Sequence, residues 1–259
     1  MTRATENAGK AMDGAIRISM WSGPRNISTA MMRSFENRPD TEVIDEPFYA
    51  QWLARSGADH PFRAETLAAY PAAFDDVLAW LNEPPAPPAT VRFFKHIAFH
   101  LADDAPLDWL DAHRSFALIR EPADMAASYA KKFDDLTPIV RSYAVARRIA
   151  DRHDRAGRPF PVVASEDILE DPRGVLAGLC AALDIPFREE MLRWPAGARA
   201  SDGPWGPHWY DAVNASTGFG DAPQADREPP ALTPHAREAA NACQADYIFL
   251  RNLRLTPTS

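Results

Sequence analysis

One short segment combines a tight turn, a cation and two hydroxyls just before an expected helix. It reads Gly23-Pro24-Arg25-Asn26-Ile27-Ser28-Thr29 and follows an apolar run at 16–22 that is typical of a buried strand. At a helix N-terminus the first backbone N–H groups have no partner inside the helix, and the helix dipole adds positive charge. Arg25 adds a full cation. The spacing predicts an anion-binding loop, and an ordinary turn with a capped helix is the plainer alternative.

A triphosphate-binding P-loop would end in Gly-Lys-Ser/Thr, whereas this segment ends in Ile27-Ser28-Thr29. The lysine that reaches the outer phosphates of a nucleoside triphosphate is therefore missing. The segment is predicted to hold a phosphate-like group of some other ligand.

A second segment has the same character. The apolar run 116–119 is short enough for a buried strand, Arg120 follows it, and Pro122 is suited to the first position of a helix that contains Ser128. Ligands of an open parallel sheet bind at the carboxyl ends of its strands. We therefore expect Arg120 and Ser128 to lie at the same edge of the sheet as the Arg25 segment.

Together the two segments resemble the donor-binding motifs of the sulfotransferase family. The resemblance implies that Pro24, Arg25, Ser28 and Thr29 bind the 5′-phosphosulfate of 3′-phosphoadenosine 5′-phosphosulfate. It implies equally that Arg120 and Ser128 hold the 3′-phosphate of this donor. A third match, at 161–172, resembles the late strand and Pro-initiated helix of the family, so that the similarity covers roughly residues 15 to 195.

The chain departs from the family pattern in two places. Ile27 stands where the loop usually has Gly, which predicts a different backbone curvature. An Arg-Lys-Gly segment, which adds contacts to the 3′-phosphate in cytosolic members, is absent near the C-terminus.

Transfer of a sulfuryl group requires a base that takes the proton of the acceptor. Glu46 is the first candidate, because it ends the expected strand 41–45 and stands before Pro47, in a context similar to that of carboxylate-dependent sulfotransferases. His96 is the second: Lys95-His96 resembles the Lys-Thr-His of cytosolic members, with the histidine one residue early. A one-residue shift reverses the face of a strand that a side chain occupies. Asp45 and His100 are weaker rivals, and Lys95 is a candidate cation of the site.

The resemblance implies a sulfotransferase that moves a sulfuryl group to a hydroxyl or amine of a small-molecule acceptor, without a metal. Two alternatives stay open. One is a small-molecule kinase or NTPase with an atypical P-loop, and the other is a non-catalytic nucleotide-binding protein of the same fold.

Strand and helix patterns alternate along the chain. Strands are expected at 16–22, 41–45, 91–95, 116–119 and 161–165, and helices at 27–36, 64–81, 122–132, 137–156, 172–183 and 234–252. The prolines of 83–88 predict a stiff linker. This alternation, with the resemblance, predicts a three-layer α/β fold: a mostly parallel sheet covered by helices on both faces, as in P-loop NTPase-like sulfotransferases.

The 259 residues, 46% of them hydrophobic, are expected to form one domain over 15–259 after a disordered stretch at 1–14. A Trp-, Pro- and Gly-rich loop at about 195–231 is predicted to cover the acceptor, or else only to pack against the body. Cys180 and Cys243 lack metal-ligand spacing and are expected to be buried free thiols.

The net charge of −8 argues against a nucleic-acid partner. No apolar run is long enough to span a bilayer, and residues 1–14 lack the layout of a secretory signal. We therefore expect a cytoplasmic protein; the sequence does not indicate its oligomeric state.

Overall fold

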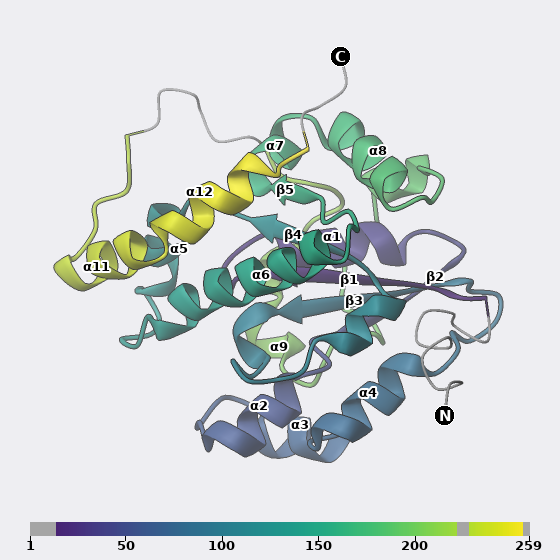
Figure 1. Ribbon diagram of the computed structural model, residues 1–259, viewed down its shortest axis with the longest axis horizontal. Coiled ribbons are helices and arrows are strands. Elements are labelled where there is room, and N and C mark those ends of the chain that lie inside the picture. Colours follow the sequence, from purple (N-terminus) through teal and green to yellow (C-terminus); the bar gives the residue numbers. More distant parts are fainter. Residues whose placement is uncertain (1–13, 222–227, 256–259) are drawn as a thin grey trace.

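A parallel five-stranded sheet forms the centre of the fold in a computed structural model that describes residues 14–221 and 228–255 (Figure 1). The strands, in the spatial order β2-β3-β1-β4-β5, are β1 (Ile16–Ser22), β2 (Thr41–Asp45), β3 (Val91–Ile97), β4 (Arg114–Ile119) and β5 (Val162–Ala164). Because β1 lies in the middle, the loops after β1, β3 and β4 meet at one edge. This is the edge at which open α/β sheets bind their ligands.

Side chains alternate between the two faces of the sheet, as the pleat of a strand requires. On β3, for example, Phe93 packs with Phe35 and Phe116, whereas Phe94 belongs to the core on the opposite face. Both faces of the central strands are buried, which explains why the strands read as nearly continuous apolar runs.

Helices cover both faces. On one face lie α1 (Ser28–Glu36) and α8 (Pro172–Ala182), and the core of the other includes α4 (Phe74–Asn82), α6 (Thr137–Arg155) and α12 (Gln244–Asn252). The predicted three-layer α/β fold is confirmed. The remaining helices are α2 (Tyr49–Ser56), α3 (Arg63–Ala69), α5 (Pro122–Tyr129), α7 (Ser165–Glu170), α9 (Gly206–Trp209), α10 (Asp211–Asn214) and α11 (Pro234–Ala242), with 3₁₀ turns η1 (Ala98–His100), η2 (Asp108–Ala112) and η3 (Glu189–Leu192).

Two predicted helices are each interrupted in the structure, and the helix expected at 122–132 ends at Tyr129. The helix expected at 64–81 is two helices, α3 and α4, because Pro71 forces Tyr70 into an extended conformation at φ −125°, ψ 146°. The helix expected at 234–252 is likewise α11 and α12, separated at Cys243. No Gly or Pro marks the second break, so the sequence carries no signal for it.

Other predictions concern the termini, the cysteines and the loop at 195–231. Residues 1–13 of the stretch predicted to be disordered lie outside the described part of the chain. Cys180 and Cys243 are buried free thiols, as expected. The loop contains the short helices α9 and α10. None of the helices described in the structure is long and apolar enough to cross a membrane.

Candidate active site

A pocket of about 500 Å³ opens at the carboxyl edge of the sheet. All the predicted site residues except Gly23 and His96 line it: Pro24, Arg25, Asn26, Ile27, Ser28, Thr29, Glu46, Lys95, Arg120 and Ser128. These residues come from the ends of four strands and from the helices that follow two of them. The fold thus joins the two predicted anion-binding segments in one cavity.

The loop after β1 curves through Arg25, which has a left-handed backbone at φ 57°. Such a conformation is uncommon for a non-glycine residue and is often found at functional sites. Ile27, the residue that replaces the usual glycine, has φ −80° and packs against the α1 side of the core. The loop therefore obtains its curvature from Arg25 and does not need a glycine at position 27.

Gly23 lies beneath this loop instead of lining the pocket. A Cβ at this position would be 2.8 Å from Sδ of Met125, which belongs to α5. The absence of a side chain lets the loop approach the helix that carries Ser128.

Hydrogen bonds hold the two anion-binding segments together. Arg120 Nη1 donates to the Arg25 carbonyl at 2.7 Å, and Arg25 Nε donates to Ser128 Oγ at 3.3 Å. Asn26 Nδ2 also donates to the carbonyl of Leu118, near the end of β4. The hydroxyl of Tyr143, on α6, donates to the Arg120 carbonyl and fixes the start of the second segment.

A buried network lies at the ends of β2 and β3. Lys95 Nζ donates three hydrogen bonds of 2.7 Å, to Asp45 Oδ1, Glu46 Oε1 and the hydroxyl of Tyr210. The Tyr210 hydroxyl donates in turn to Asp45 Oδ2 at 2.7 Å and accepts from Trp205 Nε1 at 3.0 Å. All three protons of the Lys95 ammonium group therefore donate hydrogen bonds within the protein. One of these bonds holds Glu46 in place.

Glu46 combines a strained backbone with a perturbed carboxyl group. Its φ is 45°, and its side chain is only 11% exposed. Burial raises the pKa of Glu46 to about 7, with Asp45 acting in the same direction and Lys95 opposing both. A carboxylate with such a pKa can accept a proton near neutral pH, as a general base must.

His96 is not brought to the pocket. Lys95 lies on the same face of β3 as Phe93, so that the next residue points to the opposite face. There the His96 ring is buried, stacks on Trp21 at 4.2 Å and has Nε2 3.2 Å from Ser19 Oγ. Burial holds the pKa of His96 well below its ordinary value.

The loop at 195–231 both anchors and lines the pocket. Trp205 and Tyr210 are buried, and the backbone N–H of Gly203 donates to Asp45. Arg33 of α1 forms a buried ion pair with Asp202 of this loop at 2.7 Å. Other aromatic side chains of the wall are Tyr49, Phe99, Tyr129, Phe133 and Trp209. The sequence identified the loop, but contacts between residues more than 100 positions apart, such as Tyr210 with Lys95, had no local signal.

Replacing Tyr210 by Phe tests this network. Tyr210→Phe deprives Lys95 and Trp205 of an acceptor and Asp45 of a donor, all of them buried. We expect a loss of about 1–3 kcal/mol in the free energy of unfolding, measured by urea denaturation. An unchanged midpoint and slope would show that the network does not contribute to stability.

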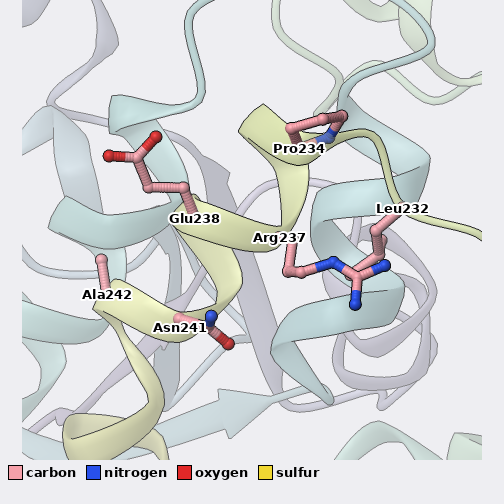
Figure 2. A pocket seen from close by; sticks show the side chains of 6 residues that line it. All are labelled: Leu232, Pro234, Arg237, Glu238, Asn241 and Ala242. Carbon is pink, nitrogen blue, oxygen red and sulfur yellow. The ribbon is translucent and has the colours of Figure 1, made fainter.

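A second hollow lies beside α11 and is lined by Leu232, Pro234, Arg237, Glu238, Asn241 and Ala242 (Figure 2). None of the predicted site residues lines it. Its two charged side chains, Arg237 and Glu238, have opposite signs and extend from the same helix. The pocket at the sheet edge is thus the candidate active site.

Comparison with known proteins agrees with the geometry. Residues 16–235 match the family model described as "Sulfotransferase domain". The sulfotransferase domain of the Synechococcus PCC 7002 olefin synthase superposes with a TM-score of 0.53 at 19% identity, covering 90% of this chain and 97% of that domain. This likeness shows the fold.

Two curated relatives are longer proteins of Arabidopsis thaliana. Branched-chain-amino-acid aminotransferase-like proteins 1 and 2 are 35% and 34% identical over 204 and 208 residues, which is 78% of this chain and 36% of each relative. The chain thus spans about a third of their length, and their names describe those whole proteins. Since the family model covers all five strands of the sheet and every predicted site residue, the chain belongs to the sulfotransferase domain family.

Proposed function

We propose that this protein is a sulfotransferase that moves a sulfuryl group from 3′-phosphoadenosine 5′-phosphosulfate to a hydroxyl or amine of a small-molecule acceptor. The observation that carries the proposal is the meeting of Arg25, Arg120 and Ser128 in one pocket, linked by direct hydrogen bonds. A donor with a phosphate at each end of its ribose needs two such cationic positions side by side.

The residues fit the donor. The amides that begin α1, with the hydroxyls of Ser28 and Thr29 and the Arg25 guanidinium, offer donors to a phosphosulfate group. Arg120 and Ser128 offer a second set for the 3′-phosphate. When bound, the donor supplies the sulfuryl group and a phosphate that leaves with the bonding electrons.

The acceptor would occupy the aromatic part of the pocket, next to Glu46. In this assignment the acceptor oxygen or nitrogen forms a bond to sulfur, its proton passes to Glu46, and the bond between sulfur and the phosphate oxygen breaks. Arg25 and the loop amides stabilise the charge that develops on the leaving phosphate. Arg120 and Ser128 orient the donor, so that its remote binding energy serves alignment.

Removal of the Arg120 side chain tests the assignment of the 3′-phosphate. Arg120→Ala should weaken binding of 3′-phosphoadenosine 5′-phosphate roughly 10- to 100-fold, as expected for the loss of charge-assisted hydrogen bonds. Isothermal titration calorimetry measures this Kd directly and needs no acceptor.

Arg237→Ala is the matched control, since Arg237 lies beside the hollow at α11 and away from the pocket. Its Kd should equal that of the unmodified protein. An unchanged Kd in Arg120→Ala, or tighter binding of ATP than of 3′-phosphoadenosine 5′-phosphate by the unmodified protein, would contradict the proposal.

A further inference from the structure

His100 lies at the end of η1, directly after β3, and its ring lines the candidate active site. The ring stacks on Tyr49 with centroids 4.6 Å apart and planes 4° from parallel, and on Trp52 at 5.2 Å. Phe99 contacts it edge-on at 4.5 Å. These aromatic contacts fix the orientation of the imidazole.

The fixed ring presents an unsatisfied nitrogen to Glu46. His100 Nδ1 is buried and has no hydrogen-bond partner among the residues that the structure describes, and it lies 3.7 Å from Glu46 Oε2. The other carboxylate oxygen, Oε1, is held by Lys95 at 2.7 Å. His100 therefore lies beside the oxygen that Lys95 does not bind, while the Tyr210 hydroxyl also acts on the Glu46 carboxyl group and lowers its pKa.

The surroundings of His100 keep its ring neutral. Its pKa is well below the ordinary value, because of burial first, and then because the Lys95 and Arg141 cations and the neighbouring His60 and His96 imidazoles disfavour a positive charge on the ring. Glu46 is the acidic group that faces it. A neutral imidazole carries one proton, and the partner of one nitrogen selects which nitrogen bears it.

We propose that His100 is a positioning residue for Glu46: whenever Glu46 is ionised, His100 Nδ1–H donates a hydrogen bond to Glu46 Oε2. A small side-chain adjustment shortens the 3.7 Å separation to hydrogen-bond length. Each carboxylate oxygen has two acceptor positions, so Oε2 keeps one for the proton of the acceptor substrate. The catalytic part of this role rests on the proposed function, whereas the hydrogen bond itself does not.

The proposal predicts how Glu46 titrates. A hydrogen bond to the ionised form lowers a carboxyl pKa, so its removal must raise that pKa. Protein labelled with ¹³C at the glutamate carboxyl groups would be titrated by NMR, with the Glu46 signal identified by its absence in Glu46→Gln. In His100→Phe, which keeps an aromatic ring for stacking, the Glu46 midpoint should rise by about one pH unit.

Two further variants separate this role from a merely structural one. His100→Asn places an amide N–H near the position of Nδ1 and should return the midpoint at least halfway to that of the unmodified protein. His60→Phe is the matched control, because His60 also lines the pocket but its Nδ1 pairs with the Tyr49 hydroxyl at 2.8 Å. Its Glu46 midpoint should not move.

Equal midpoints in His100→Phe and the unmodified protein would overturn the proposal. Should His100→Phe fail to fold, the comparison of His100→Asn with His100→Gln decides. The amide of glutamine lies as far from the backbone as Nε2 of histidine, so His100→Gln should not restore the Glu46 midpoint. The titration requires neither donor nor acceptor. A raised midpoint in a protein that transfers no sulfuryl group would therefore refute the proposed function while supporting the contact between His100 and Glu46.

Discussion

Arg25→Ala is expected to lower the rate of sulfuryl transfer roughly 100-fold or more, which corresponds to removal of one preorganised group that stabilises charge in the transition state. Arg25 is held in the pocket by its own left-handed backbone and by the Ser128 hydroxyl. Charge grows on the leaving phosphate only as the bond to sulfur breaks. The loss should therefore appear mainly in kcat, with a smaller change in the Kd of 3′-phosphoadenosine 5′-phosphate.

The measurement is the release of 3′-phosphoadenosine 5′-phosphate with the most active member of a panel of alcohols, phenols and amines. Arg25→Lys is the matched variant, because it keeps the charge and imposes the same backbone cost at φ 57°. It should retain more activity than Arg25→Ala but less than the unmodified protein, since an ammonium lacks the fork of donors. An unchanged rate of sulfuryl transfer in Arg25→Ala would show that Arg25, in the loop after β1, does not take part in catalysis.

The anion-binding segments were predictable because each is local in sequence. A strand, a turn and a helix start lie within a few residues of one another, and parallel strands bring their carboxyl ends to one edge. This rule for parallel sheets, together with the resemblance to the sulfotransferase family, predicted that the Arg25 and Arg120 segments share a pocket. The hydrogen bond from Arg120 to the Arg25 carbonyl is the detail that only the structure supplies.

The choice between Glu46 and His96 depended on the face of one strand. Both candidates stand directly after predicted strands, at 41–45 and 91–95, and sequence alone does not say at which residue a strand stops pairing. β3 continues to Ile97, so His96 is still within the ladder and faces away from the pocket. Because β3 is two residues longer than predicted, His100 lies beside Glu46, although the sequence made His100 a weaker candidate than Glu46 or His96.

The rest of the site arises from long-range contacts. Tyr210 and Trp205 meet the ends of β2 and β3 although they are far from them in sequence, and neither has a motif of its own. Polar partners of this kind are selected because a buried carboxylate and a buried ammonium need satisfied hydrogen bonds. A single sequence shows that Lys95 and Asp45 are present, but not which side chain satisfies them.

Glu46→Gln is expected to reduce kcat/KM by about 10²- to 10⁴-fold, the range for loss of a general base. Glutamine keeps the shape of the side chain and can still accept from Lys95, so binding of 3′-phosphoadenosine 5′-phosphate should stay unchanged. In the proposed mechanism the active form of the protein has Glu46 ionised. Because burial raises the pKa of this group to about 7, kcat/KM should rise with pH through that value and level off above it.

The same rise should be absent from Glu46→Gln, whose residual activity has no carboxyl group to titrate at this position. Glu46→Asp provides the matched control: it keeps the charge but withdraws the carboxylate by one methylene, so it should preserve a pH-dependent rise at a reduced rate. An ascending limb that persists unchanged in Glu46→Gln would assign the titration to another group. The base would then have to be sought among the other titratable side chains that line the pocket, with His60 and His100 the first to be replaced.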